Sequence, residues 1–235
     1  MYRQLDATHI ENTVAVLSDR VTRRFPGSGL SKVAAELATI STESMMTAEA
    51  LGRPIHLLRV GVWLCIGGIV VIAVAPFLIL NTATAFSDFG EFVQVVEAGV
   101  NDVVFLAVGI FFLATLETRF KRRRALRKLR ELRSVAHIVD MHQLSKDPEQ
   151  LLSPGDDNSV DRPILSRADL AKYLDYCSEL LSLTSKVAAL YIQNLDDPVV
   201  LESVTKIENL TTGLSRKIWQ KIMILDTIGE PAARP

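Results

Sequence analysis

The sequence contains few of the side chains on which metal centres and covalent catalysis depend. Its 235 residues include 2 cysteines and 4 histidines. The cysteines, Cys65 and Cys177, lie far apart and in segments of different polarity, so we expect two free thiols rather than a disulfide. The sequence has no Cys-x-x-Cys pair, Gly-rich phosphate loop, nucleophile elbow or His-Glu-x-x-His motif. We therefore predict a non-enzymatic protein without a cofactor.

One short segment does carry side chains that metals favour, namely His137, Asp140 and His142. On an α-helix, residues 137 and 142 lie about 140° apart around the axis, so one helix cannot aim both imidazoles at one ion. A metal site would need ligands from a second helix or a neighbouring subunit. We expect instead a local contact between His137 and Asp140, which are three residues apart.

Positive charge is concentrated in one block rather than spread over the chain. The formal net charge is −1, and residues 140–235 contain 15 acidic and 10 basic side chains. In contrast, 9 of the 15 residues in 119–133 are Lys or Arg. A nucleic-acid-binding domain usually has a basic excess across its whole surface, so we do not expect nucleic acid as a partner.

Two segments are almost uncharged, and both are candidates for membrane spans. Residues 57–80 contain Arg59 as their one charged side chain, and the second span is predicted over residues 100–117. A transmembrane helix needs about 20 apolar residues, so the second span is short, and residues 92–99 could extend it. The aromatic and aliphatic residues within 86–96 predict a short helix in the membrane interface.

The distribution of positive charge predicts the orientation. Arg53 and Arg59 precede or open the first span, the basic block follows the second, and the intervening loop, residues 81–99, has no Lys or Arg. The positive-inside rule then places both termini in the cytoplasm. Residues 1–25 contain no apolar segment typical of a signal peptide, so we expect the internal spans to direct insertion.

Small residues recur along both spans and predict where the spans pack together, because they allow helices to approach closely. Pore lining is the alternative for this surface, although two spans cannot enclose a water path without several subunits. The predicted packing residues are Gly61, Gly68, Ala75, Ala107 and Ala114.

The basic block is expected to contact anionic headgroups, because cytoplasmic leaflets carry negative charge. Binding of a nucleotide or nucleic acid, and pairing with acidic helices of another subunit, are the alternatives. The predicted headgroup contacts are Arg119, Lys121, Arg122, Arg123, Arg124, Arg127 and Lys128.

The remaining sequence has the periodicity of amphipathic helices. Two are predicted near the N-terminus, the first with a capping box of Thr8 and Glu11 and the second ended by Gly52. Asp147, Ser166 and Asp197 are the predicted N-caps of later helices. Apolar seams with alternating spacings of four and three, typical of coiled coils, lie in three segments: Ala125, Leu129, Leu132, Ala136, Val139 and Gln143; Leu170, Leu174, Cys177, Leu181, Thr184, Ala188 and Tyr191; Val200, Val204, Ile207, Thr211, Leu214, Ile218 and Leu225.

Together these features predict an all-α protein, a two-span transmembrane hairpin that carries a cytosolic antiparallel helical bundle. We expect five regions: an N-terminal helical hairpin (1–55), the transmembrane hairpin (56–118), a basic cytosolic extension of the second span (119–152), a linker (153–165) and a C-terminal helical hairpin (166–228).

Two segments carry a family likeness: residues 24–31, RFPGSGLS, and residues 136–148, AHIVDMHQLSKDP. Together they resemble signature blocks of an uncharacterised family of bacterial two-span inner-membrane proteins. The resemblance implies a bacterial cytoplasmic membrane, but it implies no activity and no ligand.

These observations predict a membrane-anchored helical interaction or scaffold module. Its expected partners are a bilayer with anionic lipids and either further copies of the chain or another protein, bound through the cytosolic helices. The alternative is a homo-oligomeric channel or pore.

Overall fold

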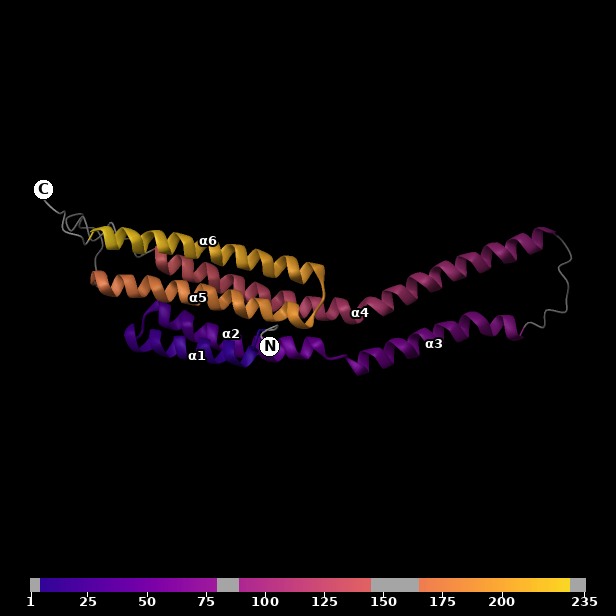
Figure 1. The fold of residues 1–235 in the computed structure, drawn as a ribbon. Helices are drawn as coiled ribbons and strands as arrows, with labels where there is room; N and C mark the ends of the chain where they lie inside the picture. The colour runs from indigo at the N-terminus through magenta and orange to yellow at the C-terminus, as the bar shows by residue number, and fades with distance from the viewer. Residues whose placement is uncertain (1–4, 80–88, 145–164, 229–235) are drawn as a thin grey trace, which may run out of the picture. The chain divides into compact units, whose positions relative to one another are not determined.

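The computed structural model describes residues 5–79, 89–144 and 165–228, and every element in these ranges is an α-helix (Figure 1). The all-α prediction is therefore confirmed. In chain order the helices are α1 (Ala7–Arg24), α2 (Gly29–Gly52), α3 (His56–Ile79), α4 (Phe89–Leu144), α5 (Arg167–Asn194) and α6 (Pro198–Ile228).

The chain divides into two compact units. The first, called the core unit, comprises residues 1–52 and 124–235, and the second, called the apolar unit, comprises residues 53–123. The core unit thus contains α1, α2, α5, α6 and the C-terminal part of α4, whereas the apolar unit contains α3 and the rest of α4.

Helix α4 is continuous over 56 residues, from Phe89 to Leu144. The sequence predicted that the helix would continue from the apolar segment into the basic block, and this is confirmed. The expectation of a separate interface helix over residues 86–96 is wrong, because residues 89–96 form the first turns of α4. No proline interrupts the segment, and single glycines weaken a helix without ending it.

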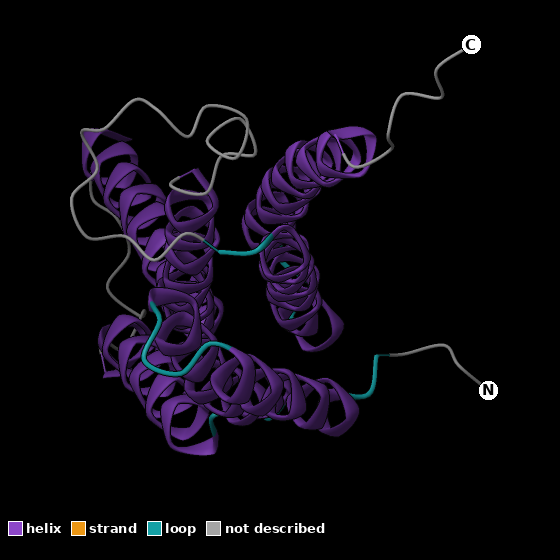
Figure 2. Cartoon of the chain, turned by 90° about the vertical axis from the view of Figure 1, so that its left-hand side faces the viewer, coloured by secondary structure: helices purple, strands orange, loops and turns teal. Residues whose placement is uncertain are grey.

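The core unit is built around one cluster of buried apolar residues. Helix α1 packs on α2, and α5 contacts α1, α2 and α6. Figure 2 shows the helices from the left-hand side of Figure 1, looking roughly along their axes. The predicted seam residues are buried: those on α4 are at most 1% exposed, those on α5 at most 4% and those on α6 at most 5%. Alternating spacing therefore identified the buried faces, because it keeps one stripe of each helix turned toward the core.

The ends of α1 and α2 follow the local sequence, with one correction. Gly27, in the turn between them, has a φ of 70°, a conformation that glycine adopts without steric cost. The N-cap of α1 is Asp6, whose carboxylate accepts a hydrogen bond from the His9 N–H at 3.1 Å. The predicted Thr8 cap is wrong by two residues, because an aspartate is at least as good an N-cap as a threonine and stands earlier in the chain.

Both C-terminal helices begin at the predicted caps. Ser166 Oγ accepts a hydrogen bond from the Asp169 N–H at 3.1 Å, and Asp197 Oδ1 accepts from the N–H groups of Val199 and Val200 at 3.0 and 3.2 Å. Residues 195–197 connect α5 to α6, a connection short enough to make the two helices antiparallel neighbours (Figure 1). The predicted cap at Asp147 and residues 153–164 of the predicted linker lie outside the described residues.

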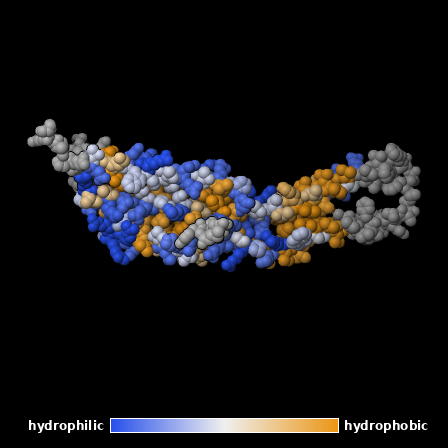
Figure 3. Space-filling model, viewed as in Figure 1, coloured by the Kyte–Doolittle hydropathy of each residue, from blue (hydrophilic) through white to orange (hydrophobic). Residues whose placement is uncertain are grey.

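The apolar unit contains two helices that are long and apolar enough to cross a membrane. Their apolar windows lie within Gly29–Val71 and Gly99–Leu144, have mean hydropathies of 1.8 and 2.0, and have none of their residues buried in the chain. Figure 3 shows apolar residues gathered over α3 and the adjoining part of α4, while hydrophilic residues cover most of the visible face of the core unit.

Bulky residues line the facing sides of the two helices in the apolar unit. Leu58, Val62 and Ile66 recur every fourth residue of α3 and are half-buried, as are Leu106, Ile110 and Leu113 on α4. The small residues Gly61, Gly68, Ala107 and Ala114 are exposed, and the side chain of Ala75 lies outside the described residues. No described atom lies within 4 Å of where a Cβ would stand at Gly61 or Gly68. The role of these small residues in packing the spans stays a prediction.

The Asp197 cap provides a test of the core unit. The Asp197→Ala substitution removes two hydrogen bonds to the first turn of α6, so we expect the free energy of unfolding to fall by about 1 kcal/mol. The neighbouring Asp196 is exposed, and Asp196→Ala is the matched control, expected within about 0.5 kcal/mol of wild type. Denaturant unfolding of the full chain in mild detergent measures both values, and equal losses would contradict the assignment of the cap.

Candidate functional site

A group of charged side chains lies in the apolar unit where the apolar sequence of α4 ends. The carboxylate of Glu117 accepts hydrogen bonds from Arg59 Nε at 2.6 Å and from the backbone N–H of Ile55 at 3.3 Å. The ammonium group of Lys121 stands 3.0 Å from the same carboxylate. We call Arg59, Glu117 and Lys121 the boundary cluster; it ties the start of α3 to α4.

The boundary cluster is partly shielded from solvent and carries a net positive charge. The side chains of Glu117 and Lys121 are 15% and 11% exposed, whereas that of Arg59 is 56% exposed. A shielded charge is tolerated when it is paired and hydrogen-bonded, and here one carboxylate has three donors. Two cations and one anion leave a formal charge of +1, so the cluster is suited to a further negative group.

This arrangement bears on one possible role of Glu117. A carboxylate at the end of a membrane span is a candidate for an ion path. Asp102, near the start of the predicted second span, would be its counterpart and is exposed. Glu117, however, already holds two cationic side chains of its own chain. Sequence alone does not pair Glu117 with Arg59, although each stands at the basic end of a predicted span.

The predicted headgroup contacts fall into two groups in the structure. Arg119, Arg123, Arg124 and Arg127 are exposed, and the Arg119 guanidinium lies over the ring of Phe112, 5.0 Å from its centroid. Arg122 is half-buried, and Lys121 and Lys128 form ion pairs within the chain. The exposed arginines are therefore the ones whose guanidinium groups are open to an external anion.

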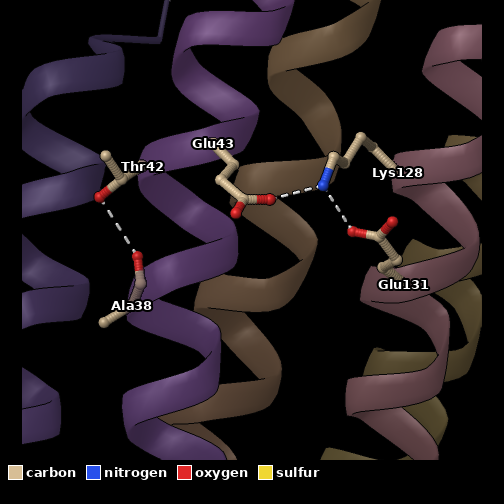
Figure 4. A network of polar contacts seen from close by, with 5 residues as sticks. All are labelled: Ala38, Thr42, Glu43, Lys128 and Glu131. Atoms are coloured by element: carbon tan, nitrogen blue, oxygen red, sulfur yellow. Dashed lines mark hydrogen bonds and ion pairs between the residues drawn. The ribbon is translucent and has the colours of Figure 1, made fainter.

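A second ion-pair network joins α4 to α2 in the core unit (Figure 4). Lys128 Nζ donates to Glu43 Oε2 of α2 at 2.6 Å and to Glu131 Oε2 of α4 at 2.8 Å. The carboxylates of Glu131 and Glu43 together raise the pKa of Lys128, so the ammonium form is retained at neutral pH. Thr42, beside Glu43, donates to the carbonyl oxygen of Ala38 at 3.3 Å.

Several polar groups of the core are buried, and burial keeps two of them, Tyr191 and Cys177, in their neutral form. The hydroxyls of Ser41, Ser44 and Tyr191 are buried, and Ser44 lies close enough to Tyr191 to oppose part of the effect of burial on the Tyr191 pKa. Burial raises the pKa of Tyr191 to about 12 and that of the Cys177 thiol to about 12. Both groups are therefore protonated at neutral pH, and neither is an activated nucleophile.

The predicted metal-binding segment is organised differently from the expectation. Asp140 accepts a hydrogen bond from Gln143 Nε2 at 2.8 Å, whereas His137 is exposed. The imidazole of His142 packs so closely against Gly29 of α2 that any Cβ at that glycine would overlap it. Within residues 5–79, 89–144 and 165–228, no group of three or more His, Cys, Asp or Glu side chains is placed to hold a metal ion.

Comparisons with known proteins give no match: no family model matches the chain, and neither a curated protein nor a solved structure does. The resemblance of residues 24–31 and 136–148 to a bacterial two-span family therefore stays a prediction.

The boundary cluster can be tested with a double-mutant cycle. Glu117→Gln leaves Arg59 and Lys121 without their anion, so we expect the free energy of unfolding to fall by about 1 kcal/mol or more. Once Arg59→Gln is present, the same change should cost less, because the pair is already broken. Glu97→Gln, at an exposed position of α4, is the control. Additive effects of the two substitutions in detergent unfolding would contradict the pairing.

Proposed function

We propose that the chain is an integral membrane protein, anchored by α3 and the first part of α4, with the core unit in the cytoplasm. The observation that carries this proposal is the exposure of the two apolar windows, in which no residue is fully buried in the chain. An apolar surface of this extent is unfavourable in water, whereas each helix is long enough for a hydrocarbon core of about 30 Å.

The orientation rests on the position of positive charge. Arg53 and Arg59 lie at the start of α3, and the exposed arginines from Arg119 onward follow the apolar part of α4. Their common side is the cytoplasmic side by the positive-inside rule, which also places both termini there. The bacterial inner membrane is supported by the resemblance of residues 24–31 and 136–148.

We further propose that the core unit is a non-enzymatic interaction module that self-associates. Ile138, Met141 and Leu144 of α4 are exposed at spacings of three, and so lie along one side of the helix. Trp219 and Met223 of α6 are exposed at a spacing of four. We call Trp219 and Met223 the α6 face.

The α6 face lies on the side of α6 that turns away from α4. Lys221 of α6 donates from Nζ to the carbonyl oxygen of Gln143 of α4 at 3.1 Å, so the Lys221 side of α6 faces α4. At about 100° per residue, Lys221 stands about 160° around the helix from both Trp219 and Met223, so the α6 face is open to a partner. A second copy is the proposed occupant, because the same surface on two chains can cover both in one two-fold contact.

A homo-oligomeric channel is the second candidate, and one observation favours it. Gly61, Gly68, Ala107 and Ala114 are exposed, so they are open to the spans of neighbouring copies. The engagement of Glu117 by Arg59 and Lys121 speaks against a carboxylate-lined path at that depth. Reconstituted bilayers discriminate the two functions: a conducting oligomer favours the channel, and silent bilayers with an intact oligomer favour the interaction module.

The orientation is testable by labelling single cysteines. In a Cys65→Ser background, Cys177 can remain, because it is buried and its thiol is protonated at neutral pH. We expect a membrane-impermeant maleimide to label Thr84→Cys in intact cells, and to label Glu202→Cys, at an exposed position of α6, only after lysis. The reverse pattern would place the core unit outside, and labelling of both sites in intact cells would contradict the anchor.

Self-association is testable by light scattering of the full chain in mild detergent. We expect a dimer or larger assembly, and Met223→Glu should weaken it at least tenfold, because a charge would be buried in the contact. The matched control is Leu201→Glu, at an exposed apolar position near the other end of α6, which should leave the assembly intact. A monomeric wild type, or equal effects of both substitutions, would refute this surface.

A further inference from the structure

The apolar unit contains a pocket between its two helices. Its volume is about 440 Å³, within the range of pockets that hold small ligands. Its lining comes from both helices and includes Leu57, Gly61 and Cys65 of α3 and Leu113, Leu116 and Phe120 of α4. The pocket belongs entirely to residues 53–123, the apolar unit.

The lining determines the chemistry of the buried part of an occupant. Every side chain in it is hydrocarbon except the thiol of Cys65, so the buried part of a ligand has to be hydrocarbon. Gly61 contributes no side chain, and nothing lies within 4 Å of where its Cβ would be. The pocket is therefore open at Gly61 and has room for added atoms there.

The length of the pocket matches one leaflet of a bilayer. The α3 residues that line it, from 57 to 65, extend over about 12 Å at about 1.5 Å per residue. Half of a hydrocarbon core of about 30 Å is about 15 Å. Because these residues stand at the basic end of the spans, the pocket corresponds to the cytoplasmic leaflet.

The charge at one end of the pocket determines which group of the ligand can lie outside the apolar lining. Ile55 lines the pocket and also donates its N–H to Glu117. The pocket residues Leu116 and Phe120 flank Glu117 in sequence, so this end of the pocket lies beside the boundary cluster. The formal charge of +1 there, with Arg59 more than half exposed, favours a negative group.

We propose that the pocket binds one acyl chain of an anionic phospholipid of the cytoplasmic leaflet, with its phosphate beside Arg59 and Lys121. Arg59 uses Nε for Glu117, and a guanidinium has further N–H donors on its two Nη atoms. A zwitterionic lipid brings a cationic group together with its phosphate and so leaves the net charge of +1 uncompensated, and a soluble anion would leave the apolar pocket unfilled. This inference rests on the proposal that α3 and α4 cross the membrane.

The test measures lipid retained by the full chain after purification in mild detergent. The chain is titrated with phosphatidylglycerol or with phosphatidylcholine of the same acyl chains, and bound lipid is counted by native mass spectrometry. We expect one tightly held phosphatidylglycerol per chain and at least fivefold weaker retention of phosphatidylcholine. Arg59→Gln should reduce this difference to less than twofold, because it removes the exposed cation.

A matched pair of glycine substitutions separates the pocket from the rest of the lipid-facing surface. Gly61→Leu fills the pocket, whereas Gly68→Leu adds the same atoms two helical turns away, outside the lining. We expect Gly61→Leu to lower phosphatidylglycerol retention at least fivefold and Gly68→Leu to leave it unchanged. Cys65→Leu enlarges a second lining residue and should lower phosphatidylglycerol retention in the same way as Gly61→Leu. It replaces Gly61→Leu in the test if that variant does not fold.

Two results would overturn the lipid site. Equal retention by the Gly61→Leu and Gly68→Leu chains would mean that lipid merely coats the spans, and equal binding of both phospholipids to wild type would remove the charge requirement. Carbonate extraction of membranes separates this failure from that of the proposed function. If the chain resists extraction but retains no specific lipid, the anchor stands and the pocket proposal falls; if the chain is extracted, both fall.

Discussion

A single uninterrupted helix, α4, has two kinds of surface along its length, and the rest of the structure depends on both. Its first part exposes apolar side chains such as Phe105 and Phe111, 75% and 67% exposed. Its last part buries one face in the core unit, where Leu129 and Leu132 are at most 1% exposed. The backbone continues across this change because helical hydrogen bonds are satisfied internally in either surrounding.

Charged side chains of α4 make their contacts where its surroundings change. Lys121 pairs with Glu117 in the apolar unit, and Lys128, two turns later, pairs with Glu43 of α2 in the core unit. Both lysines belong to a block that sequence alone marks as a uniform basic surface. In the structure, some side chains of that block form ion pairs within the chain, whereas several of its arginines are exposed. Only the exposed arginines have their full charge available to a bilayer surface or a partner.

The sequence was sufficient to predict the helices and their buried faces, because a helix that buries one face has a repeating apolar pattern. This pattern can be recognised without knowing which helix packs against it. It was also sufficient for the caps at Ser166 and Asp197. It did not predict the Arg59–Glu117 pair or the Lys128–Glu43 pair, whose partners are 58 and 85 residues apart. Such contacts depend on how helices are placed in space, and an isolated charge in sequence is compatible with many partners. The pocket was missed for the same reason.

The Lys128 network also limits how α4 can move within the core unit. One helical turn corresponds to a slide of about 5.4 Å, and a slide of that size would carry the Lys128 ammonium away from Glu43 while Glu131, on the same helix, travelled with it. The charge would keep one carboxylate and leave the other unpaired on α2. The pair with Glu43 therefore favours the observed axial position of α4 over positions one turn away.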